Sequence, residues 1–359
     1  MSGIPEALSA LPAIGLVFQF IGYIIANLTI MSHTTVAVAI PITLAALCGV
    51  MCERSGVVNI GLEGIMLVAA FVGWMVGVVC VGILGPGDPL PFFGVTAPLL
   101  IGLVAAIISG MLISLLHAWL SISLRIDQII SGTIINIGAA GITGYMYSLV
   151  SGLSPVGAGA FTQYQVPQGV ADIPIVGWLI NAILSQGPIG LTCVVIVIFL
   201  QIMLFRARWG LRTRAAGEHP RAAETVGIDV IRLRYKNVVM SGALAALGGA
   251  WLSMESVGNF NAGITQGRGF IGLAAMIVGR WTPIGAFGAA LLFASATALS
   301  NSITISPPPG DLGSVMANVP GEFWEALPYI ITIVVLAGLI GRSIAPAADG
   351  QPYERESAS

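Results

Sequence analysis

The sequence predicts an all-α protein, a polytopic bundle of transmembrane helices in a single domain. Of its 359 residues, 56% are apolar and only 8% are charged, whereas soluble domains carry about 25% charged residues. Glycine is frequent, with 46 residues. The apolar stretches are long and continuous, unlike the two-residue alternation of outer-membrane barrel strands. The composition therefore excludes most soluble folds and favours an α-helical membrane protein.

Apolar runs long enough to cross a bilayer recur along the chain, and about ten are predicted. The candidate spans are residues 12–31, 34–52, 64–84, 97–120, 127–150, 188–205, 237–257, 268–280, 283–300 and 321–341. The run 268–280 is short, so a re-entrant segment is the alternative to a crossing there. Residues 1–341 are expected to form one transmembrane domain, and the polar residues 342–359 a disordered tail.

The distribution of basic residues predicts the orientation of the spans. Residues 206–236 hold eight of the 14 Lys and Arg residues and carry a net charge of +5, so the positive-inside rule places this loop in the cytoplasm. Counting spans from it places both termini, and the tail, in the cytoplasm. The loop 151–187 has no Lys or Arg and falls outside, with a short surface helix expected over 173–184. Arg268 is the one basic residue predicted on the outer side.

The segment from Pro220 to Val226 in the cytoplasmic loop has the punctuation of a short helix. Proline is favoured at the first helical position and glycine, here Gly227, just past the last. Two turns of helix are only marginally stable alone in water, so this helix is expected to dock against another surface. On charge alone, an ordinary positive-inside loop is the alternative interpretation.

A polar pair stands at the start of the third predicted span. Asn59 and Glu63 are four residues apart and share a face if the segment is helical, and Gly61 lies between them. Broken helices in transporters expose backbone groups to a polar path, and an ionisable residue inside a span is costly enough to suggest a function. We predict that these three residues line a translocation path. The alternative is that Glu63 pairs with Arg54 and braces the bundle.

A short internal echo extends this hypothesis to a second segment. Ile60-Gly61-Leu62 recurs as Ile271-Gly272-Leu273. The two sites are five predicted spans apart, so a repeat would have inverted topology, as in many transporters. In that case Gly61 and Gly272 face each other across the path. A match of three residues also arises by chance, which is the alternative.

Two motifs give the sequence a family resemblance. The first runs from Gly210-Leu211-Arg212 through Gly217-Glu218-His219-Pro220 and Ala222-Ala223 to Gly227-Ile228. It resembles the coupling-loop motif of ABC importer permeases of the branch that serves branched-chain amino acids, simple sugars and nucleosides. The second, CERSGVVNIGLEG from Cys52 to Gly64, is nearly verbatim a segment of nucleoside-type permeases. His219 stands where the family more often has Asn. The resemblance covers about residues 34–341.

The resemblance implies a permease subunit of the inner (cytoplasmic) membrane that forms the path of a small polar solute, most often a nucleoside. It implies a separate ABC ATPase subunit, a second permease (identical or related) and an external substrate-binding protein. It also implies which residues couple to the ATPase. They are Gly217, Glu218, Pro220, Ala222, Ala223 and Gly227.

ATP chemistry is not expected in this chain. No Gly-x-x-x-x-Gly-Lys-Ser/Thr run is present, and the only lysine, Lys236, follows Tyr235, so the chain cannot form a P-loop. We therefore expect no enzyme activity and no cofactor. The three histidines and four cysteines are spaced unlike the ligands of a metal site, and no nucleic-acid partner is expected.

Two other functions remain open on the sequence. A simple-sugar permease would share the coupling motif. An ion-coupled secondary transporter, which belongs to a different class, would need intramembrane acidic residues, and Glu63 and Asp127 are the candidates; it would not need a docking helix at 220–226. An intramembrane enzyme is excluded, since the spans lack a Ser/His, Asp/Asp or His-Glu-x-x-His constellation.

Overall fold

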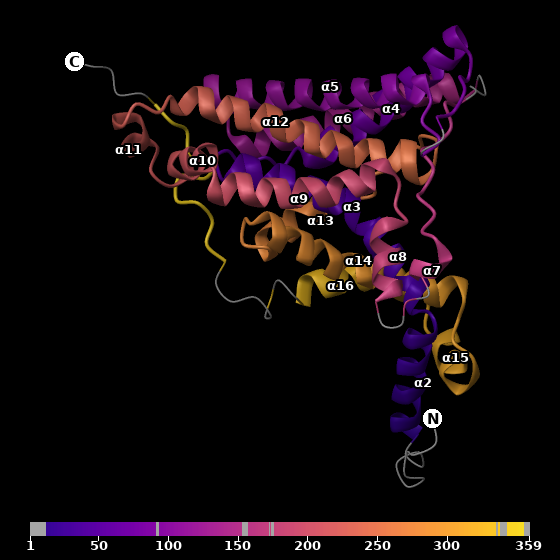
Figure 1. Ribbon diagram of the computed structural model, residues 1–359. Coiled ribbons are helices and arrows are strands. Elements are labelled where there is room, and N and C mark those ends of the chain that lie inside the picture. Colours follow the sequence, from indigo (N-terminus) through magenta and orange to yellow (C-terminus); the bar gives the residue numbers. More distant parts are fainter. Residues whose placement is uncertain are drawn as a thin grey trace.

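The computed structural model describes residues 12–90, 93–152, 157–171, 173, 176–334, 337 and 343–354. In these ranges every regular element is a helix, and seven helices are long and apolar enough to cross a membrane (Figure 1). They are α3 (Leu28–Glu53), α4 (Leu62–Leu84), α5 with the π-helical turn η1 (Ala97–Ser123), α6 (Gln128–Ser151), α9 (Pro188–Arg206), α12 with the π-helical turn η2 (Val230–Ser256) and α14 (Pro283–Ile305). The predicted all-α membrane fold is confirmed.

The predicted number of about ten spans is not confirmed. Three of the predicted spans correspond to shorter helices, α2 (Pro12–Ala26), α13 (Arg268–Val278) and α16 (Gly321–Val334). With 11 residues, α13 is about 16 Å long, half of a hydrocarbon core of about 30 Å. The boundary predicted between residues 31 and 34 is wrong, because α3 continues through it and the interruption lies at Asn27. No glycine or proline stands at 31–34 to end the helix.

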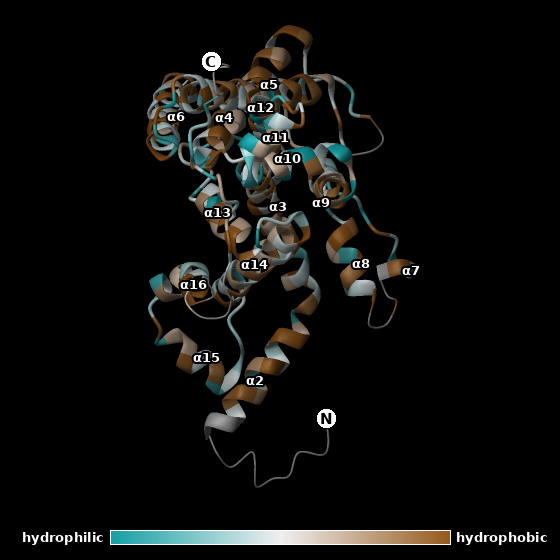
Figure 2. Ribbon diagram, turned by 90° about the vertical axis from the view of Figure 1, so that its left-hand side faces the viewer, coloured by the Kyte–Doolittle hydropathy of each residue, from teal (hydrophilic) through white to brown (hydrophobic). Residues whose placement is uncertain are grey.

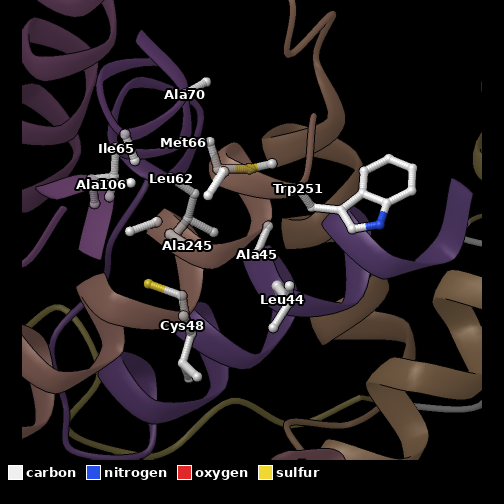
Figure 3. Packing of buried hydrophobic residues seen from close by; sticks show 14 of the residues in the cluster. Leu44, Ala45, Cys48, Leu62, Ile65, Met66, Ala70, Ala106, Ala245 and Trp251 are labelled. Carbon is white, nitrogen blue, oxygen red and sulfur yellow. The ribbon is translucent and has the colours of Figure 1, made fainter. Parts of the chain in front are cut away.

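Small residues bring the central helices close together. A Cβ atom on Gly242 of α12 would lie 2.6 Å from the carbonyl oxygen of Gly110 of α5, and one on Gly249 would lie 2.0 Å from that of Met66 of α4. Such rows of small residues are how transmembrane helices pack closely. Larger apolar side chains then fill the space between α3, α4 and α12, as Figure 3 shows for Leu44, Met66 and Trp251.

The two long loops lie at opposite ends of the bundle. Figure 1 shows α10 (Arg208–Glu218) and α11 (Pro220–Thr225) at one end, and α7 (Gln168–Ala171) and α8 (Gly177–Leu184) at the other. Hydrophilic residues gather on α10 and α11, whereas the long helices are mainly hydrophobic (Figure 2). The short helix expected over 173–184 appears as α8. The remaining helix, α15 (Gly310–Ala317), lies beside α2.

The polar C-terminal segment is packed in place, which differs from the expected disordered tail. We call residues 343–354 the C-terminal strap. The Ala348 N–H donates to the Gly217 carbonyl oxygen at 2.9 Å, and Tyr353, 8% exposed, packs with Ala216 and Val230 at the same end of the bundle as α10 and α11. Composition alone missed this, because one aromatic anchor and a few backbone hydrogen bonds hold a segment that is otherwise polar. Residues 355–359 lie outside the described ranges.

Candidate functional site

The predicted coupling segment forms the short helix α11. Pro220 is its first residue, it ends at Thr225, and Gly227 follows with φ of +83°. The prediction of a helix with these boundaries is confirmed to within one residue. The preceding helix α10, from Arg208 to Glu218, was not predicted. Its sequence is short and strongly basic, and it shows no clear alternation of an apolar and a polar helical face.

The two alanines of the motif have different surroundings. Ala223 is 3% exposed and packs against Ala216 and Val230. Ala222 is exposed and shares a helical face with the position of Val226, four residues on. The Val226 side chain is 76% exposed. The end of the bundle therefore presents a short exposed apolar strip formed by these two residues.

Two glycines of the motif, Gly217 and Gly227, are required for different structural reasons. Gly217 is buried, and a Cβ atom there would lie 2.4 Å from the Arg54 carbonyl oxygen, so only glycine allows α10 to approach the end of α3 this closely. Gly227 has open space around it but needs its positive φ to end α11. The Glu218 carboxylate accepts from the Ala347 N–H at 3.1 Å, in the C-terminal strap.

Arg54 fastens this end of α3 to neighbouring helices. Its Nε donates to the Trp281 carbonyl oxygen at 2.9 Å and its Nη2 to that of Arg280 at 3.2 Å. Its guanidinium lies 5.7 Å from the centre of the Phe205 ring. Burial lowers the pKa of Arg54, and the nearby Glu218 charge acts in the opposite direction. The Arg54–Glu63 pair considered above does not form in the structure, because both groups have other partners.

The chain is not helical between α3 and α4, and we call residues 54–61 the break. Its backbone groups find partners on side chains of α5 and α6. The Val58 N–H donates to Gln128 Oε1 at 2.6 Å, and His117 Nε2 donates to the Val58 carbonyl oxygen at 2.9 Å. Non-helical backbone at membrane depth requires such internal partners, since lipid provides none.

Asn136 of α6 makes the same kind of contact at the other side of the break. Its Oδ1 accepts from the Gly64 N–H at 2.7 Å, and its Nδ2 donates to the Ile60 carbonyl oxygen at 3.0 Å. Sequence reasoning missed both Asn136 and His117. Their signal was available, since each is a polar residue inside a strongly apolar span.

Asn59 and Gly61 lie in the interior of the protein. Asn59 is fully buried; its Oδ1 accepts from the Gly61 N–H at 3.0 Å and its Nδ2 donates to Cys52 Sγ at 3.7 Å. A Cβ atom on Gly61 would lie 3.4 Å from the Cα of Gly132. These contacts explain the two residues as parts of a closed turn, and their placement on a translocation path stays a prediction.

Glu63 joins the break to α13. Its two carboxylate oxygens accept from the Gly267 N–H at 2.8 Å and the Gly269 N–H at 2.7 Å, at the N-terminus of α13. A carboxylate is favourable there, because the first N–H groups of a helix have no intrahelical acceptor and carry partial positive charge. Gly272 lies one turn further on, where a Cβ atom would be 2.6 Å from the Ala45 Cβ of α3. The two glycine-bearing segments thus meet, while an inverted repeat stays a prediction.

Two further acidic residues also cap helices. Glu255 of η2 is 7% exposed and accepts from the Ile189 N–H at 2.7 Å and the Gly190 N–H at 3.1 Å, at the start of α9. Asp127 accepts from the N–H groups of residues 129 and 130, at the start of α6.

Comparison with known proteins decides the family. Residues 31–343 match the family model described as "Branched-chain amino acid transport system / permease component". The chain belongs to this permease family. With its seven apolar helices, the permease is a multi-pass protein of the inner membrane.

Curated relatives match the permease over nearly their whole length. It is 39% identical over 332 residues to the guanosine ABC transporter permease protein NupQ of Bacillus subtilis (strain 168), covering 92% of this chain and 98% of the relative. It is 36% identical over 330 residues to the nucleoside ABC transporter permease protein NupC of Lactococcus lactis subsp. cremoris (strain MG1363), covering 92% and 96%. It is 30% identical to the putative glucose ABC transporter permease protein TsgC13 of Haloferax volcanii, covering 90% and 97%.

Proposed function

We propose that this permease is the transmembrane subunit of an ATP-driven importer of nucleosides. The observation that carries the proposal is the similarity, over nine-tenths of the chain, to permeases named for guanosine and nucleoside transport. A separate ABC ATPase subunit hydrolyses ATP, a second permease completes the membrane assembly, and an external binding protein delivers the solute.

The structure of the bundle end that carries α10 and α11 supports the proposal that a separate subunit hydrolyses ATP. The apolar strip of Ala222 and Val226 offers the ATPase an exposed contact. Movement of α11 passes to α10, and from α10 to the break, because Gly217 packs directly on the Arg54 backbone. The break in turn holds α13 through Glu63. A continuous chain of contacts therefore leads from the docking helix to the middle of the bundle.

Two alternative functions, a sugar importer and an ion-coupled secondary transporter, can be compared with the proposal. The relative from Haloferax volcanii, named for glucose, keeps a sugar as the second candidate solute. An ion-coupled secondary transporter needs free intramembrane carboxylates, and the two candidates for that role, Glu63 and Asp127, each accept two backbone N–H groups as helix caps. The geometry therefore favours the importer.

Uptake into proteoliposomes tests the proposal. The permease is co-reconstituted with its ATPase, its partner permease and its binding protein, and ATP is supplied on the ATPase side. Radiolabelled nucleoside uptake that needs both ATP and the binding protein is the expected result. Uptake of sugars alone would keep the importer class and replace the solute. Transport by this chain alone, driven by an ion gradient, would refute the importer.

A further inference from the structure

A cavity of about 680 Å³ lies between α3, α13, α14 and α16. This volume is in the range of small-molecule sites, which are about 300–1,000 Å³. The apolar part of its wall consists of two residues of α3 together with Ile271 and Pro328, and the remaining lining residues carry polar side chains. These are Gln266, Arg268, Thr297, Ser300, Asn301 and Tyr329. Such a concentration of hydrogen-bonding groups between transmembrane helices is expected where a polar solute passes.

Arg268 places a cation at mid-depth in the bundle, not on the outer side as its position in the sequence suggested. It is the first residue of the 11-residue helix α13, whose other end lies near Arg280, about 15 Å along the axis. Its Nη1 donates to the carbonyl oxygens of Ile264 and Thr265 at 3.1 and 3.3 Å. Within the described part of the chain, Nε and Nη2 have no hydrogen-bond acceptor. The N–H groups of Nε and Nη2, which point in parallel from the guanidinium, are thus available to donate to a ligand.

The hydroxyls of α14 that line the cavity are also unused. Elsewhere on this helix, Ser295 and Thr304 donate to carbonyl oxygens three or four residues back, at 2.7 and 2.9 Å. Thr297 and Ser300, which lie between them, make no side-chain hydrogen bond to any described residue, and neither does Asn301. These three positions share one face of the helix. Because these side chains do not donate to carbonyl oxygens of their own helix, they are available to hydrogen-bond a solute.

We propose that this cavity is the solute site of the permease and that Arg268 makes it selective for 6-oxopurine nucleosides such as guanosine. The inference rests on the proposed function and adds the residues and the base preference. The base lies against the guanidinium, and the sugar hydroxyls contact the polar face of α14.

The chemistry of the guanidinium decides the base. Two parallel N–H donors match the O6 and N7 acceptors of guanine or hypoxanthine, the commonest specific contact between arginine and a base. Adenine offers an amino donor where O6 would be, so one of the two donors meets another donor. An anionic ligand is disfavoured because Glu63 already acts electrostatically on Arg268, and the other polar wall residues are uncharged.

The test compares variants in the complete importer, reconstituted with one binding protein throughout. Because the binding protein is the same for all variants, a change in selectivity between them belongs to the permease. Arg268→Lys keeps the charge and removes the two parallel donors. Thr297→Val replaces one cavity hydroxyl with a methyl group of similar size. Ser295→Ala is the matched control, since Ser295 bonds its own helix. Initial uptake rates of guanosine, inosine and adenosine are measured against concentration, with basal ATPase activity as the check on assembly.

Arg268→Lys is expected to raise KM for guanosine and inosine about tenfold, the size of one lost bidentate pair, and to leave KM for adenosine within about twofold. Thr297→Val is expected to raise KM for all three solutes about fivefold, and Ser295→Ala to resemble the wild type. Equal effects of Arg268→Lys on guanosine and adenosine would overturn the assignment of the base. Wild-type kinetics in both cavity variants would overturn the site while leaving the proposed function intact. Absence of nucleoside uptake by the wild type would overturn both.

Discussion

Replacing Glu63 with alanine is expected to detach α13 from the break and to destabilise the permease. The Glu63 carboxylate is the acceptor for two N–H groups at the start of α13, at 2.8 and 2.7 Å. Gly269 packs so tightly that a Cβ atom there would lie 2.7 Å from the Glu63 Cα. In the alanine variant, the two N–H groups therefore lose the only hydrogen-bond acceptor that the described part of the chain provides for them.

The magnitude follows from these two contacts. A hydrogen bond to a charged group contributes about 1.5–3 kcal/mol, so Glu63→Ala is expected to cost about 3–6 kcal/mol of stability. Glu63→Gln keeps one acceptor oxygen and turns its amino group towards the second donor, so about half of that loss is expected. Arg268 also loses the nearby opposite charge in both variants, which adds to the cost.

Thermal unfolding of the purified permease in detergent, followed by the loss of helical circular dichroism, measures the effect. Asp88→Asn is the matched control, since Asp88 is exposed in a loop and surface changes stay within about 0.5 kcal/mol. The expected order of unfolding temperatures is wild type and Asp88→Asn highest, then Glu63→Gln, then Glu63→Ala. A Glu63→Ala variant that unfolds with the wild type would refute the capping role of this carboxylate.

Other parts of the structure give further predictions. Glu218→Lys and Gly227→Val are expected to leave the fold intact but to uncouple ATP hydrolysis from uptake. Glu218→Lys removes the link to the C-terminal strap, and Gly227→Val strains the positive φ that ends α11. ATPase and uptake assays on the same proteoliposomes measure the coupling, and coupled uptake in both variants would contradict the prediction. Asn59→Ala is expected to cost about 1–3 kcal/mol, since it removes the acceptor of a buried N–H; an unfolding temperature equal to the wild type would count against the closed turn. Burial raises the pKa of the Asp349 carboxyl to about 6, beside Glu53 and Arg234. The strap is therefore expected to dock most tightly below about pH 4 and to loosen as the pH rises through about 6, by at most about 3 kcal/mol. Asp349→Asn is expected to abolish this dependence, and hydrogen exchange of residues 343–354, corrected for the intrinsic rate, measures it; an unchanged profile would contradict the assignment.

The candidate site shows which structural features the sequence patterns predict and which they do not. Pro220 and Gly227 bracket α11 correctly, because helix punctuation acts within a few residues of the chain. The same patterns could not show that Ala223 is buried and Ala222 exposed, because that depends on the residues of α10 and α12 that pack on one side only. Glu63 was identified as important from its cost inside a span, but its partners are more than 200 residues away in the chain.

The sequence by itself determined the class of protein and its family, whereas the orientation of its loops stays a prediction. Partition into a bilayer and helix formation add up local contributions, residue by residue, so composition and hydropathy are sufficient to predict them. Only the tertiary structure decided that the break is closed by Asn136, that Arg268 lies at mid-depth beside a polar cavity, and that the C-terminal strap is docked. Each of these depends on which distant group is available as a hydrogen-bond partner, and in a low-dielectric interior that choice is made by the packing of the helices.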